Sequence, residues 1–369
     1  MIISKIRKVG AARYLKTSKL NRRINMLKRR FKGVGSYPRV KGVVGSKQLR
    51  YSEAIDEAIE AYVGDRSDSD KAALRSDIIR CAYENDTTPA EFFIFGFEKL
   101  SKSERKAFVS RNEKDTVMMH NVSMADYKLL HDKYSFFKRF REYFKRDVCL
   151  LDSSASNDDF IEFCRKHREY IAKLESGKMG VGTTIRKHDG SEEAIRGEIE
   201  FLSSSGDKWI IEELIQQDPR MGALHPESVN TIRICSRFEN GHAVVFESFV
   251  RMGQGGSSVD NICSGGLTAQ VDGKTGIVIG DAFDRMCNFY KDHPSTGVIV
   301  KGFAIPDWDG LLKMLDQIQS KIPDYPYVGW DFAFSDKGWV IVEGNWGNFI
   351  TQYLKRGIRA EFEKCFKKH

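Results

Sequence analysis

Three oxygen-bearing side chains lie near the ends of two apolar segments in the last part of the chain. Asp331 lies in an apolar run, and Glu343 and Asn345 end the next one. The turn-like residues 335–338 between them predict an antiparallel strand pair, in which alternation places Glu343 and Asn345 on one face beside Asp331. Such a set suits Mg²⁺, which binds one or two carboxylates and completes its octahedron with phosphate oxygens and water. Ordinary surface positions at strand ends are the alternative.

A lysine and a glycine-rich segment offer a site for phosphate. Lys173 ends an apolar run, and Gly177, Gly180 and Gly182 follow it in a G-x-x-G-x-G pattern. Glycine lets backbone amides approach phosphate oxygens closely, and a lysine on a strand adds a fixed cation. The residue order differs from that of a Walker A loop and from that of a dinucleotide-binding loop. A glycine-rich hairpin without a ligand is therefore equally compatible with the pattern.

Two acids end another apolar segment. Glu212 and Glu213 follow the run that begins at Trp209, and Asp218 comes shortly after them. A carboxylate and free backbone groups at a strand end could hold the edge of an adenine, and Asp218 could reach ribose hydroxyls. An ordinary edge strand explains the same residues.

Cations lie between these segments. Arg233, with Asn230 just before it, and Arg251 each fall in or at the end of a predicted strand. Guanidinium groups there can fork onto carboxylate or transferring phosphoryl oxygens, although structural salt bridges are the competing explanation. His225 occupies the preceding loop, where it could contact a substrate, accept a proton, or have no role beyond the turn.

The elements that would position these residues differ between the two halves of the chain. The first half predicts helices at residues 53–63, 70–84, 89–98, 103–111 and 124–146. The second half contains short β-branched and aromatic runs at residues 209–215, 231–238, 243–250 and 339–343, separated by turn signals. This order predicts a helical front followed by an α+β body.

Positive charge is concentrated in the first fifty residues. The chain has 59 Lys and Arg against 51 Asp and Glu, and sixteen of the basic residues precede the first acid, Glu53. The remainder is mildly acidic. Because a nucleic-acid enzyme more often spreads basic side chains over its main cleft, we expect no nucleic-acid partner.

The basic segment contains an amphipathic pattern. Leu20, Ile24, Leu27 and Phe31 recur at helical spacing, with Lys and Arg on the other faces. Such a helix can lie on an anionic membrane surface. Docking of its apolar stripe on the protein body explains the pattern as well, and an organellar transit peptide is a third interpretation.

Cysteine use favours a reducing compartment. The seven cysteines are scattered and form no C-x-x-C pair, so neither a disulfide framework nor a structural zinc site is indicated. No apolar run approaches 18 residues. We expect a cytoplasmic protein, peripheral at the inner face of the membrane if the amino-terminal segment binds lipid.

Taken together and in this order, residues from about Asp132 to Gln352 resemble the ATP-grasp superfamily, and more closely its sugar-transfer-associated branch. The residues that carry the resemblance are Lys173 with the glycine segment, the Glu212–Glu213 pair, residues 228–233, residues 259–266, and the set Asp331, Glu343 and Asn345. The resemblance implies an α+β ATP-grasp fold, in which two α+β subdomains clasp ATP, preceded by a mainly helical amino-terminal region. The implied parts are a basic arm (1–50), a helical region (51–130) and an ATP-grasp domain (131–369), with 131–220 as its lid and hinge portion and 221–369 as its metal and substrate portion.

The same resemblance implies roles for individual residues. ATP would contact Lys133, Lys173, Gly177, Gly180, Gly182, Glu212, Glu213 and Ile215, with Asp218 as the nearest candidate for the ribose. Two Mg²⁺ ions, for which Mn²⁺ could substitute, would bind Asp331, Glu343 and Asn345. The substrate would lie near His225, Asn230, Asn261, Gly265 and Gly266, and the catalytic cations would be Lys173, Arg233 and Arg251.

The superfamily's usual reaction is carboxylate activation. The resemblance therefore implies an ATP-dependent carboxylate–amine ligase that forms an amide through an acyl phosphate. Its partners would be a small-molecule or glycan carboxylate and an amine, as in joining a sugar acid or amino acid during surface polysaccharide biosynthesis. A kinase that phosphorylates a hydroxyl, and a non-catalytic glycan-associated protein, are the two alternatives.

Overall fold

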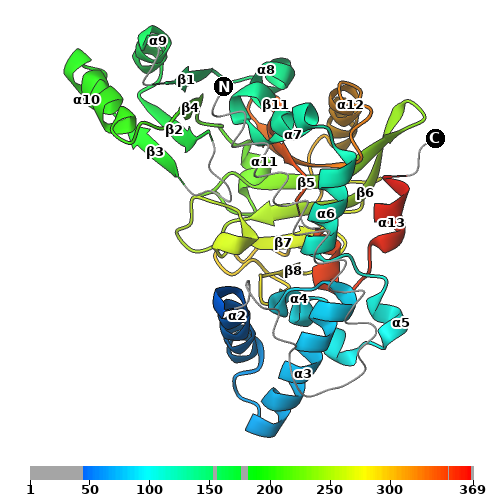
Figure 1. The fold of residues 1–369 in the computed structure, drawn as a ribbon. Helices are drawn as coiled ribbons and strands as arrows, with labels where there is room; N and C mark the ends of the chain where they lie inside the picture. Colours follow the sequence, from blue (N-terminus) through cyan, green and yellow to red (C-terminus); the bar gives the residue numbers. More distant parts are fainter. Residues whose placement is uncertain (1–44, 153–155, 176–181, 348, 367–369) are drawn as a thin grey trace. The chain divides into compact units, whose positions relative to one another are not determined.

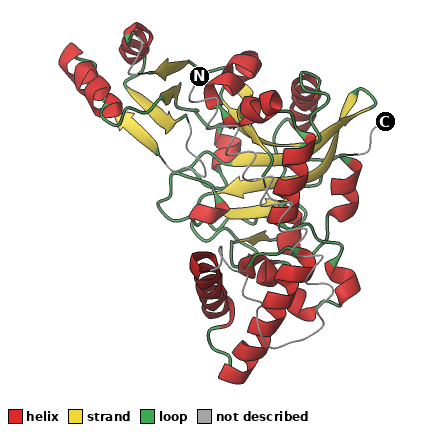
Figure 2. Cartoon of the chain, in the orientation of Figure 1, coloured by secondary structure: helices red, strands yellow, loops and turns green. Residues whose placement is uncertain are grey.

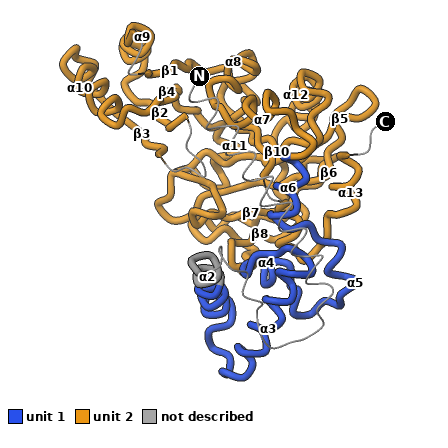
Figure 3. The backbone as a smooth tube through the Cα atoms, viewed as in Figure 1, with its two compact units in different colours: residues 1–119 blue, residues 120–369 orange. Residues whose placement is uncertain are grey.

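The structure is a computed structural model that describes residues 45–152, 156–175, 182–347 and 349–366. Gly177 and Gly180 of the predicted phosphate loop lie outside these residues, and so does most of the basic amino-terminal segment. The chain divides into two compact units, residues 1–119 and 120–369, which Figure 3 colours separately.

The first unit is helical in the part that is described (Figure 2). Thr88 begins one of its helices with a capping box, in which the Thr88 hydroxyl accepts from the Glu91 N–H and the Glu91 carboxylate accepts from the Thr88 N–H. Arg105 is buried, and its charge is compensated by two hydrogen bonds to Asp77. The elements are α2 (Gly45–Val63), α3 (Asp68–Asn85), α4 (Pro89–Ile94), η1 (Phe97–Lys99), α5 (Lys102–Arg105) and α6 (Arg111–Asn121), the last of which ends in the second unit.

The second unit begins with two helices where the sequence predicts one. Helix α7 (Met124–His131) ends and α8 (Lys133–Phe144) begins at Asp132, which has an extended backbone. The Asp132 carboxylate accepts a hydrogen bond from the Ser135 N–H and so caps α8. Lys133 consequently occupies the first turn of a helix instead of the middle of one.

A small antiparallel sheet carries the residues around Lys173. Its strand order is β1 (Val148–Leu151), β4 (Trp209–Glu213), β2 (Glu169–Leu174), β3 (Thr183–Lys187). Helices α9 (Asp158–Lys166) and α10 (Glu192–Ser203) pack on one face of it, where Phe160, Tyr170, Ala172 and Ile211 belong to a shared apolar core (Figure 1). Because side chains alternate along a strand, Lys173 and Glu212 point to the other face.

A larger antiparallel sheet carries the predicted metal and arginine residues. Its order is β11 (Gly338–Asn345), β10 (Val328–Ser335), β5 (Thr231–Glu239), β6 (His242–Met252), β7 (Leu267–Gln270), β8 (Ala282–Phe283), β9 (Phe289–Tyr290). The remaining elements are α11 (Pro219–Gly222), η2 (Ile262–Ser264), α12 (Trp308–Gln319), η3 (Ile350–Leu354) and α13 (Arg359–Lys364). Among the helices of the described residues, none combines the length and apolarity needed to cross a bilayer.

One face of the large sheet is anchored by Trp330. Its ring lies fully buried against Phe136 and Phe140 of α8, with centroid distances of 6.3 and 5.6 Å. Its indole N–H donates to Gln319 at the end of α12, at 2.8 Å. Trp330 therefore fixes β10 against both helices, while its neighbour Asp331 points to the opposite face.

Replacing Trp330 by alanine should reduce the free energy of unfolding by about 3–5 kcal/mol, because the change leaves a large cavity between β10 and α8. The matched control is Phe201→Ala, since Phe201 is 55% exposed and its loss should cost about 1 kcal/mol or less. Urea denaturation of the full chain measures both. Similar losses for the two variants would contradict this account of the core.

Candidate active site

Strand pairing brings the predicted metal residues together. Asp331 of β10 lies directly opposite Glu343 of β11 on one side and Arg233 of β5 on the other. A β-bulge leaves Val342 without a partner between the Asp331–Glu343 and Phe332–Ile341 pairs. Since a bulge redirects the side chains beside it, this irregularity helps to aim Glu343 at the Asp331 side of the sheet.

Asp331 is held by two arginines. Arg233 donates from Nε and Nη2 to the two carboxylate oxygens at 2.6 Å each, and Arg251 Nη1 lies 3.0 Å from Oδ2. Asp331 is 2% exposed, and its burial disfavours the charged form, but the two guanidinium groups outweigh that effect and lower its pKa well below the usual range. Asp331 is thus an anion throughout the physiological range.

The arginines are themselves fixed from the other side. Arg251 Nη2 lies 3.2 Å from an oxygen of Asp260, whose second oxygen accepts hydrogen bonds from the backbone and hydroxyl of Thr231. Burial disfavours the charged form of Arg233, but the Asp331 carboxylate raises its pKa above the ordinary value. The result is a continuous row of alternating charges across β10, β5 and β6.

Glu343 lies on the open side of this row. Its side chain reaches solvent, yet the surrounding protein removes much of its hydration, and this desolvation together with the nearby Asp331 carboxylate raises its pKa. Asn345 donates from Nδ2 to Glu343 at 3.2 Å, and its Oδ1 accepts from the Gly347 N–H at 2.7 Å. Two carboxylates and the Asn345 side-chain amide therefore lie together at this end of β10 and β11.

The two predicted phosphate-binding lysines come from different elements, Lys133 from α8 and Lys173 from β2 of the small sheet. Lys173 Nζ donates to Glu212 at 2.8 Å. Lys133 Nζ donates to the carbonyls of Leu174 and Glu175, at 2.9 and 3.2 Å. Burial and then the charge of Lys173 lower the pKa of Lys133, whereas Glu343 and Glu212 act in the opposite direction. Lys133 is thus within electrostatic range of Lys173 and Glu212 in the small sheet and of Glu343 in the large sheet.

A small cleft lies where the two sheets meet. Its empty volume is about 230 Å³, including space open to solvent. Ile215 lines it together with the backbone that follows β4 and with the β10–β11 turn. The lining residues are Phe144, Lys145, Arg146, Glu213, Leu214, Ile215, Gln216, Ser335, Asp336, Lys337 and Val340.

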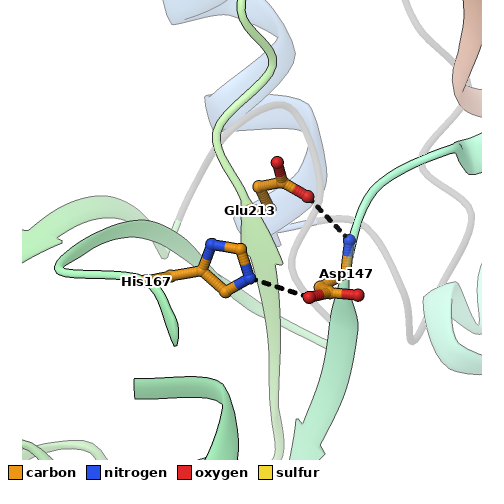
Figure 4. Close-up of side chains that lie close together, drawn as sticks. All are labelled: Asp147, His167 and Glu213. Carbon is orange, nitrogen blue, oxygen red and sulfur yellow. Dashed lines mark hydrogen bonds and ion pairs between the residues drawn. The ribbon is translucent and has the colours of Figure 1, made fainter. Parts of the chain in front are cut away.

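Glu213 forms hydrogen bonds with residues around this cleft, among them Asp147 (Figure 4). Its carboxylate accepts from the Asp147 N–H and from Lys337 Nζ, both at 3.0 Å, while His167 Nε2 bonds to the Asp147 carboxylate at 2.8 Å. Ligand atoms of Asp147, His167 and Glu213 lie within 4.8 Å of one another. These bonds join the end of β4 to the residue before β1 and to the β10–β11 turn.

Asp218 also has structural partners. It caps α11 by accepting from the Arg220 N–H at 2.9 Å, and it pairs with the Arg220 side chain. Its predicted contact with ribose would have to compete with both.

Two of the predicted substrate residues are buried in a loop network. Asn230 Nδ2 donates to the carbonyls of Met221 and His225, at 2.9 and 2.8 Å. His225, 1% exposed, bonds through Nε2 to the Gly255 carbonyl at 3.0 Å. Asn230 therefore holds the loop that contains Met221 and His225, and His225 joins this loop to the segment after β6.

The other three predicted substrate residues, Asn261, Gly265 and Gly266, lie in the segment that leads to β7. Asn261 is partly exposed and caps the η2 turn by accepting from the Cys263 N–H at 2.9 Å. Gly265 has φ +92°, and a Cβ on Gly266 would lie 2.4 Å from the Asp260 carbonyl. Both positions thus require glycine, which keeps this segment close to Asp260 and hence to Arg251.

Comparison with known proteins identifies the fold. A family model described as sugar-transfer associated ATP-grasp matches residues 123–361. The chain belongs to this ATP-grasp family. Its α+β architecture, with two antiparallel sheets and a helical amino-terminal region, agrees with the expectation from the sequence.

Solved structures similar to this ATP-grasp chain are distant in sequence. The D-alanine–D-alanine ligase from Coxiella burnetii has 10% identity and a TM-score of 0.37, over 68% of this chain and 64% of that one. N5-carboxyaminoimidazole synthetase from Staphylococcus aureus has 11% identity and a TM-score of 0.39, over 64% of this chain and 52% of that one. Biotin carboxylase from Campylobacter jejuni has 10% identity and a TM-score of 0.39, over 66% of this chain and 47% of that one. The match spans about half to two thirds of these structures. No curated protein matches the sequence.

The sequence assigned no role to three residues that the structure places beside predicted site residues. Arg146 was included in a predicted helix, although a cation directly before an apolar strand could have signalled it. Asp260 lies in a segment that carried the resemblance but was given no role. His293, whose Nε2 bonds to the Gly253 carbonyl at 2.7 Å, has no sequence signal because its partner is 40 residues away.

Asp331→Asn should destabilise the second unit by about 3–5 kcal/mol, because it leaves the buried charges of Arg233 and Arg251 without their main counter-ion. The control is Asp336→Asn, an exposed carboxylate in the neighbouring turn. Since the folded pKa of Asp331 is depressed, its stabilisation is present above the unfolded pKa of about 3.9 and is lost only as the pH falls below that value. Urea denaturation should therefore show the same loss in free energy of unfolding, relative to the wild type, at pH 5 and at pH 8. A loss that is present at pH 8 but absent at pH 5 would contradict the assignment.

Proposed function

We propose that this ATP-grasp protein is an ATP-dependent carboxylate–amine ligase that forms an amide through an acyl phosphate. The observation that carries the proposal is the meeting of the two charged faces. Lys133, in the first turn of α8, lies within electrostatic range both of Lys173 in the small sheet and of Glu343, which neighbours the Asp331–Arg233–Arg251 row of the large sheet. A nucleotide triphosphate between the sheets would meet cations for its phosphates and oxygen ligands for its metal.

The nucleotide would lie along the junction of the sheets. Its base would lie beside Ile215, next to the strand end that carries Glu212. Lys133 and Lys173 would bind phosphate oxygens, assisted by the glycine segment that includes Gly182. Each lysine is already positioned by a protein acceptor, so little side-chain ordering would be needed on binding.

Asp331, Glu343 and Asn345 fit a magnesium site in their chemistry, because they supply two carboxylates and an amide oxygen and leave other positions to phosphate and water. We propose two ions, with Mn²⁺ able to substitute. Bound Mg²⁺ would neutralise charge on the β- and γ-phosphates. The two hydrogen bonds from Arg233 would keep the Asp331 carboxylate in its orientation.

Arg233 and Arg251 would stabilise the phosphoryl group in transfer. A substrate carboxylate oxygen attacks the γ-phosphorus and ADP leaves, which gives an acyl phosphate. An amine then attacks the acyl carbon, and phosphate departs where hydroxide could not. The protein supplies positioning and fixed positive charge at both steps.

For the carboxylate we propose a sugar acid or an amino acid of surface polysaccharide assembly, which the sugar-transfer description of the family supports. The acceptor side would be formed by the segment containing Asn261, Gly265 and Gly266, because Asp260 joins it to Arg251. The experiment is a screen of acids and amines for phosphate release with mass detection of the joined product. A stable phosphorylated product without amine would indicate a kinase, and the absence of any thermal shift with ATP and Mg²⁺ would indicate a non-catalytic protein.

Glu343→Gln and Lys173→Met should each reduce kcat by about 100-fold or more, because each removes charge that acts on the transferring phosphate. Both variants should fold, since Glu343 lies at the open side of the cluster and Arg146 still pairs with Glu212 when Lys173 is replaced. Phosphate release at saturating ATP measures the effect, with Glu200→Gln, which changes an exposed carboxylate on α10, as the control. Full activity in Glu343→Gln would contradict the metal assignment.

The amino-terminal basic segment is proposed to contact an anionic membrane surface. Deleting residues 1–50 removes sixteen cations and the apolar stripe, so sedimentation with vesicles containing anionic lipid should fall to the level seen with neutral vesicles. Thermal unfolding of the truncated chain serves as the control for folding. Unchanged sedimentation would exclude this segment as the membrane contact.

A further inference from the structure

Arg146 occupies the crossing between the two sheets. It follows Lys145, whose φ of 48° ends α8, and it precedes β1 of the small sheet. Helix α8 itself packs on the large sheet through Phe136 and Phe140. Arg146 therefore lies where the chain passes from one sheet to the other.

The guanidinium group bonds to both sheets. Nε and Nη2 donate to Oε2 of Glu212 in the small sheet, at 2.9 and 2.6 Å. Nη1 donates to the carbonyl of Ile341 in the large sheet at 2.8 Å, and to that of Phe144 at 3.2 Å. The side chain is 3% exposed and lies over the Phe144 ring, so its orientation is fixed.

Each carboxylate oxygen of Glu212 accepts hydrogen bonds from a different cationic side chain. Arg146 takes Oε2, and Lys173 donates to Oε1 at 2.8 Å. Burial opposes ionisation of Glu212, but Lys173 and Arg146 outweigh it and lower its pKa to about 2. With Arg146 present, the charge of Glu212 is balanced without the full charge of Lys173.

We propose that Arg146 is a positioning residue of the nucleotide site, which acts through Glu212 to leave Lys173 available for a phosphate and joins the small sheet to the large one. The proposal rests on the proposed function, because it takes a nucleotide phosphate as the ligand of Lys173. Without Arg146, Lys173 would be the only cation hydrogen-bonded to Glu212 among the described residues, and it would have to leave that buried carboxylate in order to bind phosphate. Such a loss carries the cost of an uncompensated buried charge.

The nature of the side chain matters at this position. A lysine would keep the positive charge beside Glu212, but its single nitrogen cannot bond Glu212 and Ile341 in the planar fork that arginine provides. Replacement by lysine therefore tests the loss of the bonds between the sheets alone, whereas replacement by an uncharged side chain also removes the charge beside Glu212.

The test is calorimetric titration of the full chain with ADP in the presence of Mg²⁺. Arg146→Met should weaken ADP binding about tenfold, and Arg146→Lys should restore most of that loss. Arg139→Met is the matched control, because Arg139 also lies on the α8 side and donates to a carbonyl, that of Lys321, but has no contact with Glu212 among the described residues. It should bind ADP as the wild type does.

A double-mutant cycle distinguishes positioning from general support of the fold. If Arg146 acts through Lys173, then Arg146→Met should add little to the loss caused by Lys173→Met. Independent, additive losses, or unchanged ADP affinity in Arg146→Met with only a lower Tm, would overturn the proposal. If Arg146→Met fails to fold, the same cycle is run with Arg146→Gln, which also removes the charge beside Glu212 but keeps a polar side chain. Failure of the wild type to bind ADP would instead refute the proposed function itself.

Discussion

The buried ion pair between Asp331 and Arg233 is the interaction on which the rest of the site depends. A carboxylate at 2% exposure requires cations at hydrogen-bonding distance, and antiparallel pairing of β10 with β5 supplies one directly opposite it. Such a pair contributes little net stability, because desolvation offsets most of the attraction. Its value lies in geometry, since charges fixed before substrate arrives need no reorganisation during the reaction.

In each sheet, one face packs against helices and the other face carries the charged residues of the proposed site. Trp330 packs against α8 while the adjacent Asp331 points to the other face, and Ala172 and Ile211 pack under α9 and α10 while Lys173 and Glu212 point away. The period of two along a strand is enough to produce this separation. Rigid apolar faces thus hold the charged residues, and Arg146 connects the two charged faces through β4 and β11.

The sequence predicts local features well and long-range partners poorly. The β10–β11 hairpin could be predicted because its turn and alternation are local, and the fold could be predicted from the order of several motifs. The break at Asp132 was missed, since a helix cap within an amphipathic run changes little in the apolar pattern. The roles of Arg146, Asp260 and His293 depend on partners 66, 29 and 40 residues away, respectively, and no short pattern encodes such contacts.

The cations of the site already have partners within the protein. Lys173 and Arg146 pair with Glu212, Arg233 and Arg251 pair with Asp331, and Lys133 donates to backbone carbonyls. In the proposed reaction, phosphate binding to Lys173 weakens its bond to Glu212, so the carboxylate left behind needs a second cation close by. Arg146 meets that need in the small sheet, as Arg233 and Arg251 together do for Asp331 in the large one. Doubling the counter-ion of each buried carboxylate therefore allows one cation to act on substrate while the other keeps the carboxylate compensated.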